Sequence, residues 1–140
     1  MHKYLLLVAS LMLGSSIVAA QNFDDVFNAQ RAMYGKGHTF TFAGKQYTTE
    51  HPEELEAAAE ATAENAKALI ASAKAQHAQA RALGFGWSLT KGIIKSADKA
   101  FKAANFRQAM QLAAQAKYHA RMGIVQYHRS QKEWIKAVPQ

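Results

Sequence analysis

The sequence contains no cysteine among its 140 residues. This absence excludes disulfide bonds, thiolate metal sites, covalently attached c-type haem and a cysteine nucleophile. Proline is nearly absent as well, because it occurs only at Pro52 and Pro139, whereas alanine occurs 29 times. Alanine is the strongest helix former and proline the strongest helix breaker, so this composition predicts an all-α fold. The length allows one modest domain at most.

The sequence also lacks an apolar run long enough to cross a membrane, which takes about 20 residues. Its first 20 residues instead have the pattern of a cleavable signal peptide: a positive start at 1–3, a ten-residue, mostly apolar stretch at 4–13, and small residues at 18–20. We expect cleavage after Ala20, since an uncleaved anchor would need a longer apolar stretch. The mature chain then has 120 residues and a net charge of +6. An exported protein without cysteine fits the bacterial periplasm.

Residues 21–50 form an aromatic segment with the alternating pattern of a small β-hairpin over residues 38–48. A turn at Ala43-Gly44 would pair Phe40 with Tyr47. A two-stranded hairpin is marginally stable alone, so we expect it to pack on the helices or to stay mobile. We interpret the aromatic side chains as packing residues rather than as a ligand site.

Residues 51–140 predict a helical domain with helices at about 52–83, 88–104 and 106–136. Alanines recur every seven residues in the first helix, which predicts a seam that a neighbouring backbone approaches closely: Ala59, Ala66, Ala73 and Ala80. The second helix is amphipathic, with Leu89 on its apolar side and lysines on the opposite side. Together these patterns predict an Ala-rich antiparallel three-helix hairpin or bundle with a small N-terminal β-hairpin element.

The predicted helix lengths do not match one another. The outer helices have about 30 residues, near 45 Å, whereas the middle helix has about 16 residues, near 24 Å. The third helix must therefore overhang, kink at Gly123 or pack on another protomer. Large apolar residues in that portion predict a partner: Ile124, Tyr127, Trp134 and Ile135. The alternative is that this portion folds back onto the aromatic segment.

No enzyme signature is present. The glycine pairs at 35–37 and 84–86 do not match a phosphate loop or a dinucleotide fingerprint. The five histidines that follow residue 20 include no pair at i, i+4 with a carboxylate at ligand spacing. We therefore predict no catalytic residue, no cofactor and no metal ligand, although a histidine site assembled only in three dimensions is an alternative.

Charge is distributed unevenly along the chain. Residues 21–64 carry 3 basic and 8 acidic side chains, whereas residues 65–140 carry 13 basic and 2 acidic ones. In the third predicted helix, Tyr118, Met122 and Val125 lie at i, i+4 and i+7 among cationic residues that include Arg121 and Arg129. An apolar stripe surrounded by cations is typical of a surface that binds an acidic protein. A merely solvated face is the alternative meaning of such charges.

Residues 84–95 contain the block Gly-Phe-x-Trp-x-x-Thr-x-x-Ile-Ile-Lys, which is followed by a short turn at Asn105-Phe106 and the run Ala-Met-Gln-Leu-Ala at 109–113. Over roughly residues 55–130, this arrangement resembles the small periplasmic SoxXA-binding proteins. The resemblance implies a non-catalytic accessory subunit that binds the haem-carrying SoxXA cytochrome and supports thiosulfate oxidation.

We therefore predict a partner-binding surface made of Phe85, Trp87, Tyr118, Arg121, Met122, Val125, Arg129 and Trp134. The expected partner is an acidic protein such as a SoxXA-type cytochrome, and self-association is a further alternative. Two other functions stay open: an envelope-surface protein whose basic helices bind anionic lipid or polysaccharide, and a metal-binding helical protein. The periplasmic compartment disfavours nucleic acid as a partner.

Overall fold

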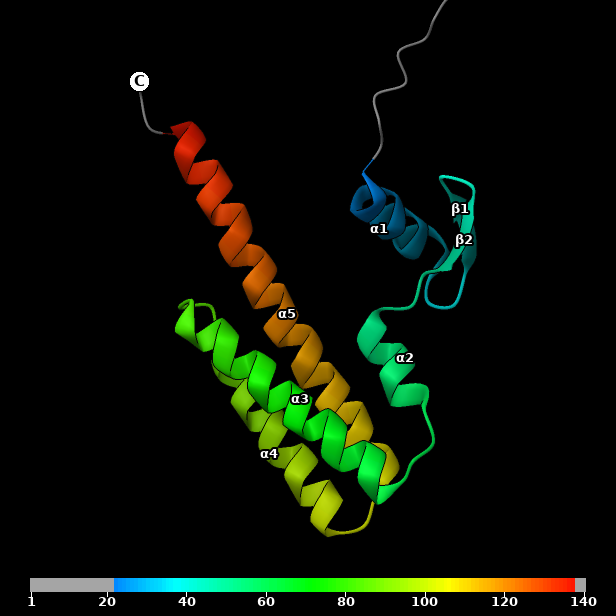
Figure 1. Cartoon of the computed structure of the whole chain (residues 1–140), viewed down its shortest axis with the longest axis vertical. Coiled ribbons are helices and arrows are strands. Elements are labelled where there is room, and N and C mark those ends of the chain that lie inside the picture. Colours follow the sequence, from blue (N-terminus) through cyan, green and yellow to red (C-terminus); the bar gives the residue numbers. More distant parts are fainter. Residues whose placement is uncertain (1–21, 138–140) are drawn as a thin grey trace, which may run out of the picture. The chain divides into compact units, whose positions relative to one another are not determined.

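The computed structural model describes residues 22–137, with side chains as far as Trp134, and divides them into two compact units at residues 22–49 and 50–137. The predicted signal peptide lies outside the described residues. Within them the chain has five helices and one two-stranded antiparallel sheet, which agrees with a mostly helical fold carrying a small β-hairpin. The elements are α1 (Phe23–Tyr34), β1 (Thr39–Phe42), β2 (Lys45–Thr48), α2 (Pro52–Ala58), α3 (Ala63–Ala82), α4 (Ser88–Lys102) and α5 (Phe106–Ala137) (Figure 1).

The first unit packs a helix against the predicted hairpin. β1 and β2 pair with Phe40 opposite Tyr47, which confirms the predicted register. Ala43 and Gly44 both have positive φ, at 48° and 77°, as the tight hairpin turn requires. The sequence patterns did not predict α1, although Asn22 caps it by accepting a hydrogen bond from the Asp24 N–H at 3.3 Å.

Aromatic rings form the interior of this unit. The Phe23 ring of α1 lies 4.8 to 6.1 Å from four other rings, measured between centroids: Phe27, Phe40, Phe42 and Tyr47. Thr49 closes the unit, because its buried hydroxyl donates to the Gly35 carbonyl at 2.6 Å and accepts from the His38 N–H at 2.9 Å. The aromatic segment therefore packs on itself, as a hairpin of this size needs a helix to be stable.

The single helix predicted over residues 52–83 is wrong, because residues 59–62 separate α2 from α3. Thr62 caps α3 by accepting from the Asn65 N–H at 3.1 Å, and the Asn65 amide donates to the Glu60 carbonyl at 2.9 Å. These local bonds offer the backbone an alternative to a continuous helix. The alanine seam is consequently shorter than predicted: Ala59 is exposed outside the helices, whereas Ala66, Ala73 and Ala80 are fully buried.

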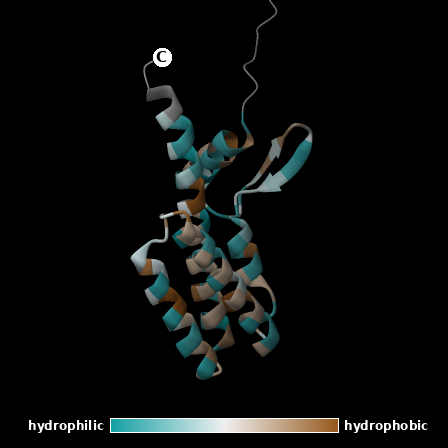
Figure 2. Cartoon of the chain, turned by 60° about the vertical axis from the view of Figure 1, so that its left-hand side comes forward, coloured by the Kyte–Doolittle hydropathy of each residue, from teal (hydrophilic) through white to brown (hydrophobic). Residues whose placement is uncertain are grey.

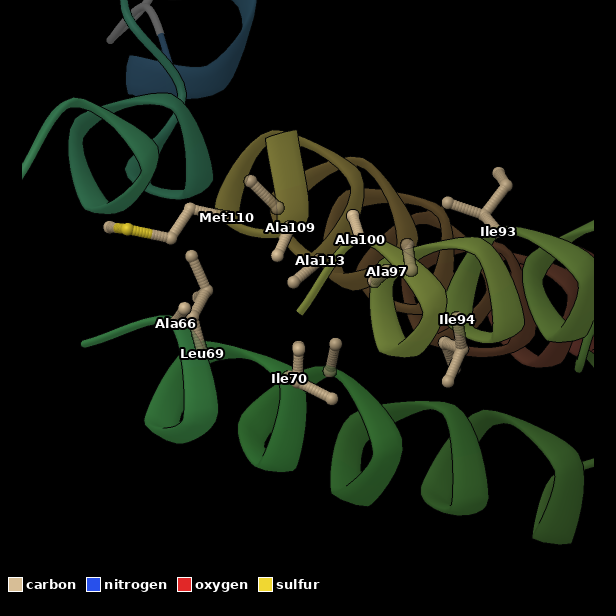
Figure 3. Close-up of a cluster of buried hydrophobic side chains, with 13 residues drawn as sticks. Ala66, Leu69, Ile70, Ile93, Ile94, Ala97, Ala100, Ala109, Met110 and Ala113 are labelled. Atoms are coloured by element: carbon tan, nitrogen blue, oxygen red, sulfur yellow. The ribbon is translucent and has the colours of Figure 1, made fainter. Parts of the chain in front are cut away.

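In the second unit α3, α4 and α5 pack against one another, and α2 packs against α5. α4 runs in the opposite direction to α3 and α5 (Figure 1). Hydropathy alternates along each of these helices, as expected of helices with one face in a core (Figure 2). Figure 3 shows side chains of α3 and α5 that point toward one another in this core: Ala66, Leu69 and Ile70 on α3 and Ala109, Met110 and Ala113 on α5.

α4 begins at Ser88 and ends at Lys102, close to its predicted bounds, but one of its apolar side chains lies elsewhere than expected. Its N-cap is Trp87, whose side chain makes no capping hydrogen bond. Leu89 was expected in the apolar side, but 64% of its surface is exposed. The buried side of α4 consists of Thr90, Ile93, Ile94, Ala97 and Ala100.

Candidate protein-interaction site

Gly123 marks the place where α5 leaves the other helices of its unit. A Cβ atom on this residue would lie 2.3 Å from the Phe85 carbonyl oxygen, so only glycine lets the loop between α3 and α4 pass this close. One turn later the Phe85 and Tyr127 rings meet edge to face, with centroids 5.8 Å apart. The α3–α4 loop therefore packs against α5 just beyond the middle of this helix.

Beyond Tyr127, α5 continues for ten residues to Ala137, which is about 15 Å of helix. Figure 1 shows this portion extending beyond the ends of α3 and α4. The predicted overhang is thus present, and α5 is one continuous helix rather than two helices joined at Gly123. Trp134, with 69% of its surface exposed, lies on this overhang.

An open groove of about 410 Å³ begins where the overhang begins. Its apolar lining comes from Phe85, Met122 and Val125, and the Val125 side chain is 40% exposed. Toward the end of α5 the lining is polar and charged, with Gln126, Arg129, Ser130 and Glu133. The Ser130 hydroxyl donates to the Tyr127 carbonyl at 2.7 Å, so that donor is already used. We call these seven residues the overhang groove.

Arg121, which was predicted to belong to the partner-binding surface, does not line the overhang groove. Its guanidinium donates two hydrogen bonds to the Glu53 carboxylate of α2, at 2.6 and 3.0 Å. Lys117, one turn earlier, donates to Glu56 of α2 at 2.6 and 2.7 Å. Both cations therefore hold α2 on α5. This region of the surface is less positive than the sequence suggests.

Glu53 is the most buried charged residue of this contact, with 2% of its surface exposed. Burial alone would raise its pKa. The hydrogen bonds from Arg121 and from its own backbone, with the charges of Arg121 and His51, outweigh burial and hold the pKa of Glu53 below its usual value. The Glu53 carboxylate therefore stays charged even at acidic pH, and its ion pair with Arg121 continues to hold α2 on α5.

The rings of Tyr118 and Trp87 also contact other residues of the second unit. The Tyr118 ring lies 4.8 Å from the His51 ring, and the Arg121 guanidinium lies 5.3 Å from its centroid. The Trp87 ring lies 5.6 Å from the His119 ring, yet Trp87 keeps 41% of its surface exposed. The eight predicted residues therefore divide: Phe85, Met122, Val125 and Arg129 share the overhang groove, whereas Tyr118 and Arg121 face α2, and Trp87 and Trp134 lie outside the groove.

The histidines that the structure describes, between residues 22 and 134, do not come together as a metal site. Among the described residues, no group of three or more histidines and carboxylates is arranged to hold a metal ion. His77 is buried in α3, and burial, together with the charges of Arg81 and Lys91, lowers its pKa, so it is neutral near pH 7. No helix within the described residues has both the length and the apolar character that a membrane span needs.

Sequence reasoning missed three members of the overhang groove, namely Gln126, Ser130 and Glu133. These three residues could have been predicted from the sequence, because steps of three and four residues from Met122 reach each of them on the same face of a helix. The role of Glu53 could not have been predicted from the sequence. It pairs with a residue 68 positions later in the chain, and no local pattern signals such a contact.

The chain matches no known family model, no curated protein and no solved structure.

Proposed function

We propose that this protein is a non-catalytic, exported accessory protein that binds an acidic partner protein through the overhang groove. In this proposal α3, α4 and α5 act as an antiparallel three-helix bundle that holds the overhang of α5 away from the core. The observation that carries the proposal is the groove itself, in which an exposed apolar lining adjoins charged residues at the unsupported end of a long helix.

Charge favours an acidic partner. Residues 124–137 carry three cations and one carboxylate, and neither Arg129 nor Glu133 has an ion pair among the described residues. An uncompensated positive potential at a binding face raises the rate of encounter with an acidic protein. The resemblance of residues 84–113 to SoxXA-binding proteins suggests a periplasmic SoxXA-type cytochrome as that partner.

The test measures association and dissociation rates of the mature chain with a purified SoxXA-type cytochrome at about 0.05 M and 0.5 M salt. Val125→Ala and Met122→Ala should each speed dissociation about tenfold, because each removes apolar contact from the groove. Arg129→Glu should mainly slow association, and more so at low salt. Leu55→Ala, which truncates an exposed apolar side chain on α2, is the control and should change neither rate.

Absence of binding at low salt would reject the cytochrome as the partner. Binding that is unchanged in all three groove variants would keep the cytochrome but reject the overhang groove. The proposed export has its own test, since N-terminal sequencing of protein from the periplasmic fraction should begin at Gln21.

A further inference from the structure

α4 carries a row of four lysines that the packing of the unit does not use. Lys91, Lys95, Lys99 and Lys102 are all exposed. Their spacing of four, four and three residues places them within an arc of about 80° and along about 16 Å of helix. None of them has an ion pair within residues 22–134, and Asp98, the only acid of α4, pairs with Lys74 of α3 at 2.8 Å. We call these four residues the lysine face.

The side of α4 that carries the lysines includes the small residues Ser88 and Gly92, and Asp98 lies at its edge. Gly92 lies within the helix, where glycine is the poorest choice after proline. A Cβ atom there would meet nothing within 4 Å, and the residue has no positive φ, so neither packing nor backbone conformation requires glycine. Ser88 and Ser96 are also small and exposed. A broad, flat surface can therefore approach the helix closely between the lysines.

One exposed apolar side chain continues the lysine face toward the start of α4, because Trp87 lies four residues, about one helical turn, before Lys91. Trp87 is 41% exposed, whereas Leu89, which is 64% exposed, lies about 160° around the helix from Lys91. Tryptophan prefers the boundary between membrane and water, and lysine heads bind anionic headgroups. A hydrated polysaccharide or a soluble polyanion offers no apolar phase that could bury the Trp87 ring, whereas a bilayer does.

We propose that α4 docks on an anionic phospholipid bilayer, with the lysine face against the headgroup phosphates and with Trp87 entering the interface. The apolar side of α4 stays in the core of the unit, so the contact is peripheral and largely electrostatic. The observations that carry this inference lie on α4 and do not depend on the overhang groove.

The first experiment measures binding of the mature chain to vesicles of phosphatidylcholine with about 30% phosphatidylglycerol. The test variant replaces all four residues of the lysine face by glutamine, which keeps helix propensity. The control variant makes the same change at four exposed lysines elsewhere, so that both lose the same charge: Lys36, Lys45, Lys67 and Lys132.

The parent should bind these vesicles at low salt and should not bind pure phosphatidylcholine. Each lysine of the face should contribute about fivefold, so the test variant should bind several hundredfold more weakly, with an unchanged circular dichroism spectrum. The control variant should stay within about tenfold of the parent. An equal loss in both variants would show that net charge alone is responsible and would overturn the proposal, as would no binding by the parent.

A second experiment distinguishes lipid from other polyanions. In a Trp134→Phe background, the fluorescence of Trp87 should shift to shorter wavelength on anionic vesicles and should not shift with dextran sulfate. Trp87→Ser should weaken vesicle binding about tenfold and leave dextran sulfate binding unchanged. Binding to dextran sulfate without binding to vesicles, or vesicle binding that is indifferent to Trp87→Ser, would overturn the bilayer as the occupant.

Discussion

The two halves of α5 have similar amounts of charge but opposite surroundings. The first half places buried alanines and Met110 in the core, and its cations Lys117 and Arg121 are paired with carboxylates of α2. The second half, beyond Gly123, exposes Val125, Arg129 and Trp134. In this helix the same residue types therefore stabilise the fold before Gly123 and are available to a partner after it.

The largest expected effect is a difference in the free energy of unfolding between variants of Arg121 and of Arg129. Arg121→Met should lower the free energy of unfolding by about 3 kcal/mol, because it leaves the buried carboxylate of Glu53 without its partner. The same variant should raise the pKa of Glu53, which an NMR titration would show. Arg129→Met is the matched control and should stay within about 0.5 kcal/mol of the parent. Equal losses in chemical denaturation would remove the distinction between the halves.

The next effect concerns the close packing of α3 against the first half of α5. Ala73 is fully buried, so Ala73→Leu should overfill the contact and destabilise the protein by about 1 to 3 kcal/mol. Ala71 lies on the same helix and is exposed. Ala71→Leu should therefore leave the melting temperature nearly unchanged. A neutral or stabilising Ala73→Leu would mean that the alanine seam does not face a tightly packed neighbour.

A pair of glycines tests the boundary between the halves. Gly123→Ala brings a Cβ atom against the Phe85 carbonyl oxygen, so the clash should exceed the helix-propensity gain of about 1 kcal/mol and lower stability by about 1 kcal/mol net. Gly92→Ala meets nothing within 4 Å and should raise stability by about 0.5 to 1 kcal/mol. Thermal unfolding of both variants measures the contrast, and the same sign in both would contradict it.

Mild acid should weaken the packed part of the unit slightly. The folded pKa of His77 lies below its ordinary value of 6.5, so the unfolded chain binds the proton first as pH falls and stability decreases. The loss between pH 7 and pH 6 is at most about 0.7 kcal/mol. His77→Leu should remove it, whereas Arg129→Met should keep it. The lowered pKa of Glu53 adds a further loss in the same direction below about pH 4.5.

Local chemistry made part of this molecule predictable. The alternation around Ala43-Gly44 placed Phe40 opposite Tyr47, and the heptad spacing identified Ala66 and Ala73 as buried. Helix lengths alone predicted the overhang of α5, because a 15-residue helix cannot cover one of 32 residues. Each of these inferences depends on spacing within one segment, which is the information that a single sequence carries.

Two features of the structure were not predicted from the sequence, because they depend on competing local hydrogen bonds and on an ion pair between distant residues. The break at residues 59–62 depends on the side chains of Thr62 and Asn65, which compete with an otherwise helical alanine pattern. Arg121 looked like a surface cation because its partner lies 68 residues earlier. Two of the eight residues predicted for the interaction surface, Tyr118 and Arg121, consequently lie against α2.

The central position of α5 also determines how the second unit folds. α3 and α4 contact each other less extensively than either contacts α5, and the bonds that fasten α2 join residues 50, 61 and 68 positions apart. Closing such long loops costs chain entropy that is recovered only when α5 docks. The unit therefore cannot complete its core until its last helix has been synthesised, and the docking of α5 is the step that should limit the rate of refolding.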